Sequence, residues 1–278
     1  AVVNGLIDIY KFWITNYDID GFRVDTVKHV NAEFWQQFTP AILDHAAAQG
    51  KADFFVFGEV FSSNENLLSF YTTGSGADIP AVLDFRFQEK VRNYISKQGK
   101  ADELRDLFAD DDFFTDSDSS AYSLPTFLGN HDMGRFGYFL HADNPGGLPD
   151  AELLARDKLA HALMYFARGV PIVYYGDEQG FVGDGGDKDA RQDMMPSQVA
   201  SYNDDDLIGT DATTAVANFD PTHPLYEALQ RYSELRKSHP ALETGAQIHR
   251  YSTDAAGIYA FSRIDRTEKI EYIIAANN

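Results

Sequence analysis

The 278-residue sequence contains no cysteine, so no disulfide framework holds the fold, and the redox compartment cannot be inferred. Basic residues are scarce, because 23 Lys and Arg stand against 43 Asp and Glu, giving a net charge of −20. This charge argues against nucleic acid or an anionic membrane as a partner. No apolar run approaches the roughly 18 residues that a membrane-spanning helix needs.

A starting methionine and a charged-then-apolar leader are also missing, because the sequence begins Ala1-Val2-Val3. We interpret this as an absent native N-terminus, which hides any export signal. We expect a secreted or periplasmic location rather than a cytoplasmic one, although the residues present carry no signal for it.

Strand-like and helix-like segments alternate over residues 1–240, which indicates an α/β architecture of a size that suits one barrel domain. The continuous apolar run Phe54–Phe57 is typical of a strand that is buried on both faces of a parallel sheet. Strands are predicted near residues 22, 56, 83, 126 and 172, and helices over 5–17, 31–48, 88–98, 102–109, 151–168 and 224–238.

The pattern changes beyond Pro240. Ile258–Arg263 and Tyr272–Ala276 are two β-like runs that a charged turn joins. We interpret residues 241–278 as the first strands of a separate all-β sandwich domain. The acidic stretches 110–118 and 204–206 are predicted to be solvated loops.

Three short acidic segments follow the predicted strands, at Asp20–Asp25, Phe57–Val60 and Phe127–Asp132. Each places a carboxylate where a strand ends, which is where a (β/α)8 barrel assembles its active site. Two carboxylates that face one bond are the requirement of glycoside hydrolysis. The sequence therefore indicates an enzyme that acts on sugars.

Asp25 lies two residues after Arg23, so alternation along a strand puts both side chains on one face. A guanidinium group close to a carboxylate favours its ionised form, which suits a nucleophile. An ordinary structural ion pair explains these two residues about equally well.

Glu59 follows an apolar run and Gly58, a residue that allows another chain or a ligand to approach closely. Apolar surroundings favour the protonated form of a carboxyl group, which is the form that a general acid needs. The alternative is a buried glutamate that is paired with a backbone donor.

Asn130, His131 and Asp132 place three polar groups at the end of an apolar strand, between Gly129 and Gly134. We expect Asp132 to hold sugar hydroxyls or to stabilise positive charge, and His131 to donate a hydrogen bond to a substrate hydroxyl.

These segments resemble the α-amylase family, glycoside hydrolase family 13. Residues 21–29, 58–60 and 127–132 are similar to the family's segments around the fourth, fifth and seventh barrel strands, and residues 170–178 resemble the eighth. The resemblance implies an α/β fold, a (β/α)8 TIM barrel with strands four to eight present over residues 1–240, followed by the start of the sandwich domain.

The implied function is that of a retaining α-glucan hydrolase, which cleaves α-1,4 bonds through a covalent glycosyl-enzyme. The alternatives are a transglycosylase or isomerase of the same family, and an inactive fragment or non-catalytic barrel relative. The resemblance makes Asp25 the nucleophile, Glu59 the general acid/base and Asp132 the third carboxylate. The implied substrate-binding residues are Arg23, Lys28, His29, Asn130 and His131.

The family's first conserved segment would lie upstream of residue 1, as would the first three strands. We therefore expect these 278 residues to self-associate, or to pair with the missing N-terminal segment, and to be nearly inactive alone. The family's calcium site draws an Asn and an Asp from the missing part, together with the backbone carbonyl of His29. Calcium is thus expected only in the complete enzyme and is not required by these residues.

The glycine-rich segment 183–189 carries Asp184, Asp187 and Asp189 and is a second place to consider for calcium. Its spacing does not match the ligands of an EF-hand.

Overall fold

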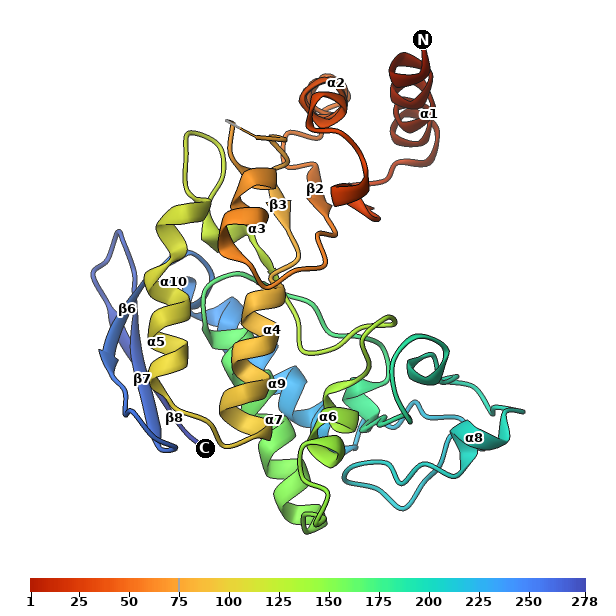
Figure 1. Cartoon of the computed structure of the whole chain (residues 1–278), viewed down its shortest axis with the longest axis vertical. Coiled ribbons are helices and arrows are strands. Elements are labelled where there is room, and N and C mark those ends of the chain that lie inside the picture. The colour runs from red at the N-terminus through yellow and green to blue at the C-terminus, as the bar shows by residue number, and fades with distance from the viewer. Residues whose placement is uncertain (75) are drawn as a thin grey trace. The chain divides into compact units, whose positions relative to one another are not determined.

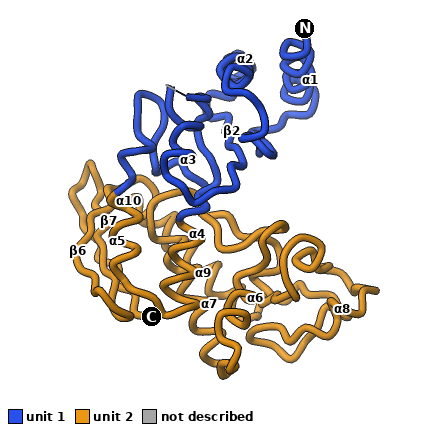
Figure 2. Tube along the Cα trace, viewed as in Figure 1, with its two compact units in different colours: residues 1–86, 110–125 blue, residues 87–109, 126–278 orange. Residues whose placement is uncertain are grey.

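Two compact units make up the part of the chain that the computed structural model describes, residues 1–74 and 76–278 (Figure 1). Unit 1 comprises residues 1–86 and 110–125, and unit 2 comprises residues 87–109 and 126–278 (Figure 2). This division does not follow the boundary proposed near residue 240, which stays a prediction.

Unit 1 is built on a parallel sheet with the strand order β1-β2-β3. Gly21 pairs with Phe55 and Val24 pairs with Gly58, so β1 and β2 end at the same level. The elements of this unit are α1 (Val2–Tyr17), β1 (Gly21–Val24), η1 (Val27–His29), α2 (Ala32–Ala48), β2 (Phe55–Gly58), α3 (Glu65–Thr72), β3 (Ala81–Val82), η3 (Asp111–Phe114) and η4 (Ala121–Ser123).

Helix α2 shows why this unit has a core. Its apolar residues Trp35, Phe38 and Ile42 recur at helical spacing and are all buried. Gly50 has a positive φ of 85° just after the helix and ends it. Asn31 occupies the N-cap position, and its side chain makes no capping hydrogen bond.

Unit 2 packs α7 against α9, and its core extends to the C-terminal strands, where Tyr259 and Phe261 are buried. Its helices are α5 (Asp102–Ala109), α6 (Phe136–Ala142), α7 (Asp150–Phe166), α8 (Ala200–Asn203), α9 (Pro224–Ser238) and α10 (Pro240–Thr244), with the π-helix η2 (Arg92–Ser96) and the 3-10 helices η5 (Asp177–Gln179) and η6 (Asp187–Ala190). Helix α4 (Phe85–Val91) and strand β4 (Pro125–Thr126) each contain residues of both units.

Strands lie at or next to the five predicted places, but three of them are short. β3 stops at Val82, and β4 and β5 (Val170–Pro171) have two residues each. Phe85 already belongs to α4, so the strand predicted near residue 83 ends before it. Pro125 and Pro171 explain why β4 and β5 are short, because proline has no N–H to donate to a strand ladder.

The chain ends in a three-stranded antiparallel sheet, β6 (Ala246–Tyr251), β7 (Ile258–Ile264) and β8 (Glu271–Asn277), which lies beside α5 and α10 (Figure 1). The sequence predicts β7 and β8 but not β6. Most of β6 is exposed and polar, so it lacks a clear apolar alternation. Across the described residues, none of the helices is both long and apolar enough to cross a membrane.

One face of α1 is apolar and uncovered. Ile7 and Ile14 are buried, whereas Phe12 and Trp13 are 50% and 45% exposed, and Leu6, Ile9 and Tyr17 are exposed beside them. Strand β1 is also an edge of its sheet. Uncovered apolar faces and strand edges both promote association.

We expect the 278-residue chain to self-associate through this face of α1. The double substitution Phe12→Gln and Trp13→Gln keeps helix propensity but removes apolar surface, so it should shift the chain toward the monomer. Light scattering after size-exclusion chromatography measures the shift. Phe219→Gln is the control, because Phe219 is an equally exposed ring in unit 2. A wild-type chain that stays monomeric at high concentration would contradict the prediction.

Candidate active site

The predicted site residues form two groups, one in each unit. Arg23, Asp25, Lys28, His29 and Glu59 belong to unit 1. Asn130, His131 and Asp132 belong to unit 2. Within each unit the structure brings the chemically important members of the group together.

Arg23 contacts both carboxylates of unit 1. Its Nη1 donates a short hydrogen bond to Asp25 Oδ1, and its Nη2 lies 3.3 Å from Glu59 Oε2. The contact follows from the sheet, because Val24 is opposite Gly58 and each carboxylate residue directly follows its strand. A single guanidinium group therefore holds two carboxylates at the ends of neighbouring strands.

The two carboxylates differ in their access to water. The side chain of Asp25 is 65% exposed, whereas that of Glu59 is 7% exposed. Glu59 Oε2 also accepts a hydrogen bond from the Thr26 backbone N–H at 3.1 Å. An accessible carboxylate can approach a substrate atom, and a buried one is shielded from bulk water.

Backbone contacts keep the ends of β1 and β2 together. The Glu59 N–H donates to the Val24 carbonyl at 2.8 Å, and the Val27 N–H donates to the Glu59 carbonyl at 3.0 Å. A Cβ atom on Gly58 would lie 2.6 Å from Val27 Cγ2. Glycine at this position thus permits the close approach of another chain segment, as the sequence suggests.

Lys28 and His29 lie on η1, directly after this junction. Lys28 Nζ donates to the Phe61 carbonyl at 2.7 Å and lies 5.9 Å from the centre of the Phe61 ring. This contact ties η1 to the segment after β2. His29 is exposed.

In unit 2, a tight turn carries the other three residues. Asn130 and Gly134 exchange backbone hydrogen bonds of 3.0 and 3.2 Å. Asn130 Oδ1 accepts the backbone N–H groups of Asp132 and Met133, both at 2.9 Å. The Asn130 side chain therefore shapes the turn, a role that the sequence did not indicate.

Asp132 lies between two cationic or polar side chains. His131 Nε2 is 3.2 Å from Asp132 Oδ2, and Arg191 Nη2 is 3.3 Å from Asp132 Oδ1. Arg191 also pairs with Asp187 at 2.9 Å. Sequence analysis missed Arg191, and the four-residue spacing from Asp187 to Arg191 was its only available signal.

Arg135, at the N-cap of α6, is a second residue that the sequence analysis missed. It is fully buried. Its Nη1 lies 3.0 Å from Asp177 Oδ1, and burial raises the pKa of Asp177 to about 6, with Arg135 opposing that effect. His161 on α7 is also buried and pairs with Asp157 at 2.8 Å.

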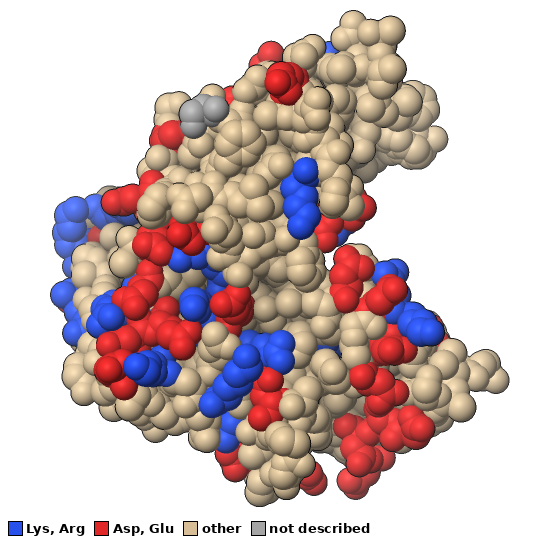
Figure 3. All heavy atoms as spheres, in the orientation of Figure 1, with Lys and Arg blue, Asp and Glu red and all other residues tan. Residues whose placement is uncertain are grey.

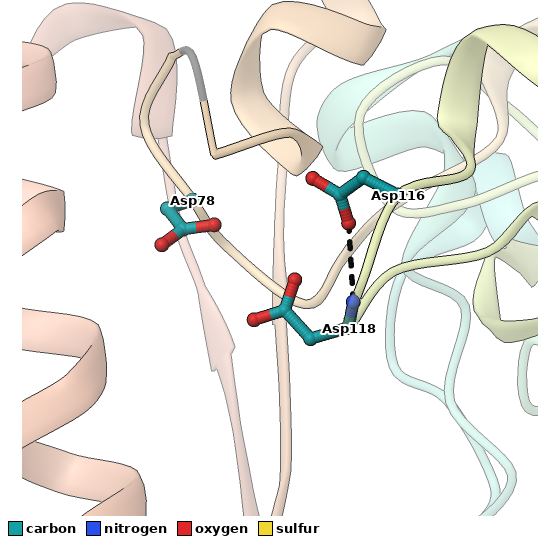
Figure 4. Close-up of side chains that lie close together, drawn as sticks. All are labelled: Asp78, Asp116 and Asp118. Atoms are coloured by element: carbon teal, nitrogen blue, oxygen red, sulfur yellow. Dashed lines mark hydrogen bonds between the residues drawn. The ribbon is translucent and has the colours of Figure 1, made fainter.

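A carboxylate cluster in unit 1 is a candidate for a cation site. Asp78, Asp116 and Asp118 lie close together (Figure 4). However, Asp116 accepts hydrogen bonds from the Gly74 N–H and from Ser119, which lower its pKa well below the usual range. Protein donors thus already stabilise its charge, and nothing in this cluster requires a metal ion.

A second carboxylate cluster lies in unit 2, on the strongly acidic side that carries α8 (Figure 3). It consists of Asp184, Asp204 and Asp205, and lines a cavity of about 430 Å³. Asp187 and Asp189 are not part of it, so the calcium loop considered for 183–189 does not form. Burial raises the pKa of Asp205 to about 6, and Gln192 Nε2 donates to its Oδ2 at 3.2 Å. The prediction of a solvated loop over 204–206 is therefore wrong for Asp205, which is buried.

The resemblance implies a calcium site at His29, but neither of the two carboxylate clusters found among the described residues includes His29. A single backbone carbonyl does not supply the six to eight oxygen ligands that calcium takes. The residues of this chain alone therefore do not fit a calcium site at that position.

Carboxylates at the ends of neighbouring parallel strands, with helices between the strands, are the arrangement of a (β/α)8-barrel catalytic domain. The chain belongs to the α-amylase family, because the family described as "Alpha amylase, catalytic domain" matches residues 1–245.

Individual relatives agree with this assignment. An α-amylase of Streptomyces lividans is 51% identical over 277 residues, which cover 100% of this chain and 30% of that protein. A cyclomaltodextrin glucanotransferase of Klebsiella oxytoca is 27% identical and is matched over 90% of this chain and 38% of its own length.

Solved structures are similar as well. The α-amylase of Anoxybacillus has a TM-score of 0.78 at 29% identity, covering 100% of this chain and 52% of that one. The α-amylase of Geobacillus thermoleovorans, in complex with acarbose, has a TM-score of 0.76 at 28% identity, covering 99% and 52%. The chain thus spans about half the length of these structures, which fits a partial barrel.

The raised pKa of Asp177 predicts how stability depends on pH. Asp177 has a folded pKa of about 6 against an ordinary value of 3.8, so the native state binds more protons than the unfolded state between these values. This contribution to stability is present below pH 4 and is lost as the pH rises through 6. A shift of this size corresponds to about 3 kcal/mol.

Asp177→Asn should remove this dependence. The free energy of unfolding of the wild type, relative to the variant, should fall from pH 4 to pH 7 in urea titrations. Asp143→Asn is the control of opposite sign. Burial raises the pKa of Asp143, but hydrogen bonds from Arg92 and Ser96 outweigh burial and lower it. The prediction would be contradicted if the free energies of unfolding of the two variants, each relative to the wild type, changed with pH in the same direction.

Proposed function

We propose that these residues carry the catalytic carboxylates of a retaining α-glucan hydrolase that cleaves α-1,4 bonds. The observation that supports this most directly is the contact of Arg23 with both Asp25 and Glu59. Family membership supplies the class of substrate. The related structure that is complexed with acarbose supports an oligosaccharide-like ligand.

The proposed reaction has two steps. Asp25 attacks the anomeric carbon, while Glu59 donates a proton to the leaving glycosidic oxygen, so a covalent glycosyl ester forms on Asp25. Glu59, now ionised, then takes a proton from water, and the water oxygen attacks the same carbon. The ester bond to Asp25 breaks, and the sugar leaves with its anomeric configuration retained.

The environments of the two carboxylates support these roles. Asp25 is accessible to a substrate and is paired with a permanently charged guanidinium, which complements the negative charge of an attacking carboxylate. Glu59 is buried, so its carboxyl group is shielded from bulk water. Arg23 orients both groups through separate nitrogen atoms.

The remaining site residues are assigned to substrate binding. We assign to Asp132 the stabilisation of the positively charged transition state, with His131 donating a hydrogen bond to a sugar hydroxyl. We assign to Lys28 and His29 the contacts with sugar units beyond the cleavage point. Arg23 and Asn130 complete the substrate-binding set, although Asn130 acts through the shape of its turn.

We also propose a place in the barrel for each strand. Strands β1 to β5 are assigned to barrel strands four to eight within residues 1–240, and residues 241–278 to the start of a β-sandwich domain. Calcium is assigned to the complete enzyme only, with His29 contributing its carbonyl. The enzyme is placed outside the cytoplasm, in secreted or periplasmic form.

Transglycosylation is the second candidate, because cyclomaltodextrin glucanotransferases are among the relatives. Both reactions pass through the same glycosyl-enzyme, and they differ in whether water or a sugar hydroxyl attacks it. Product analysis on maltooligosaccharides separates them, since only transglycosylation gives products longer than the substrate or cyclic ones.

We expect Asp25→Asn to lower turnover on starch by several orders of magnitude, since it removes the attacking charge but keeps the side-chain shape. The assay uses the longest natural polypeptide that contains these residues. Thermal stability should change little, because Asp25 is exposed. Asp20→Asn is the control, since Asp20 is an exposed carboxylate paired with Lys51 at the other end of β1. Near-normal turnover of Asp25→Asn would exclude it as the nucleophile.

A second expectation concerns geometry. In a crystal structure of that polypeptide with a bound oligosaccharide, the carboxyl groups of Asp25 and Glu59 should be about 5–5.5 Å apart, and Asp132 should face the same sugar. A separation near the 6.5–9.5 Å of inverting enzymes would point to inversion instead.

A further inference from the structure

The guanidinium of Arg135 connects three segments of unit 2. Arg135 comes three residues after Asp132, at the N-cap of α6, and is fully buried. Its Nη1 donates to the Tyr175 carbonyl at 2.7 Å and to Asp177 Oδ1 at 3.0 Å, in the segment after β5. Its Nε donates to Gln192 Oε1 at 2.7 Å, at the end of the 183–192 segment.

Three aromatic rings fix the position of this guanidinium. Its Cζ lies 4.4 Å from the centre of the Tyr174 ring, and 5.2 and 5.1 Å from those of Tyr175 and Phe181. Its Nη2 is buried without a hydrogen-bond acceptor among the described residues. Burying a charge in this way costs desolvation energy that an apolar side chain would avoid. Stability alone therefore does not explain an arginine here.

Arg135 is connected to two segments that contact or carry Asp132, the 130–134 turn and the segment that ends at Gln192. The turn that carries Asp132 is closed by the hydrogen bonds between Asn130 and Gly134, and Arg135 follows this turn directly. On the other side, Gln192 is the neighbour of Arg191, which contacts Asp132 Oδ1 at 3.3 Å. An exposed ion pair of this kind contributes little energy by itself, so its geometry must come from the segments that carry it.

The same two segments also meet through their backbones. The Asp187 N–H donates to the Asp132 carbonyl at 3.0 Å. A Cβ atom on Gly186 would lie 2.5 Å from that carbonyl oxygen, so the 183–192 segment lies directly against the turn. Contacts this close transmit a displacement of one segment to the other.

We propose that Arg135 is a positioning residue for Asp132, because one buried guanidinium holds both the turn that carries Asp132 and the segment that carries Arg191. This inference rests on the proposed function, in which Asp132 stabilises the transition state. A displacement of a transition-state contact by about 1 Å costs on the order of 100-fold in rate. Arg135 therefore contributes to turnover without touching the substrate.

Arg135→Lys tests the proposal in the longest natural polypeptide that contains these residues. Lysine keeps the charge but loses the planar fork, so it cannot hold Asp177 and Gln192 in the same geometry. We expect kcat to fall by about 100-fold, with KM changed much less. A kcat within about threefold of the wild type would overturn the proposal.

Arg263→Lys is the matched control. Arg263 is also fully buried, but it donates to the carbonyls of Phe166, Glu243 and Gly245, which are not part of the segments around Asp132. It should lower the Tm comparably while leaving kcat within about threefold of the wild type. An equal loss of kcat in both variants, at matched Tm, would show a general structural effect and overturn the proposal.

A double-mutant cycle distinguishes a positioning role from a merely structural one, because it measures whether the kcat losses of the two substitutions are coupled. If Arg135 acts through Asp132, adding Arg135→Lys to Asp132→Asn should lower kcat no further than Asp132→Asn alone. If the two losses multiply, Arg135 acts independently of Asp132 and the proposal is wrong.

Gln192→Met is a second variant, which serves if Arg135→Lys does not fold. It removes the acceptor of the Arg135 Nε bond at similar volume and should also lower kcat with little effect on KM. Near-normal turnover of Asp132→Asn would overturn the proposed function and this inference together. A large loss in Asp132→Asn with normal turnover in Gln192→Met and Arg135→Lys would overturn this inference alone.

Discussion

The parallel register between β1 and β2 is the constraint on which the site in unit 1 depends. Val24 lies opposite Gly58, so the residues that follow, Asp25 and Glu59, leave the sheet side by side. A slip of one residue would turn one carboxylate to the other face. The backbone bonds at the strand ends fix this register, and Gly58 allows Val27 to lie close against β2. Arg23 can contact both carboxylates only because the backbone has already placed them.

Unit 2 positions its polar residues by different means. Its strands β4 and β5 are only two residues long, so a strand ladder cannot hold the turn at Asp132. A buried ion pair between Arg135 and Asp177 holds the surrounding segments instead. Such pairs cost desolvation, and apolar residues of similar volume are often as stable. Their advantage is direction, since a guanidinium fork defines where each partner must lie.

The sequence predicts those features whose physical causes are local. Helix α9 has the predicted bounds 224–238, because proline at its first turn and an apolar stripe mark it. The positions of Asp25 and Glu59 also follow from local signals, since each comes after a short apolar strand. The Arg23–Asp25 contact follows from alternation over two residues.

Long-range contacts are what the sequence analysis missed. Arg135 meets its partners 40 to 57 residues away, and Arg191 meets Asp132 at a separation of 59 residues. The periodicity of apolar residues along the sequence does not indicate contacts between residues so far apart. The short lengths of β4 and β5 follow from Pro125 and Pro171, because proline interrupts the ladder within an apolar run.

The two ways of holding a carboxylate should respond differently to mutation. In unit 1 the side chains depend on backbone hydrogen bonds that also form the sheet, so a change that moves Asp25 or Glu59 disturbs the fold of the unit. In unit 2 the support of Asp132 comes from the buried side chains of Arg135 and Gln192. A substitution among these side chains can therefore change the geometry at Asp132 without breaking a strand pairing, whereas Asp25 and Glu59 are placed by the register of β1 and β2 itself.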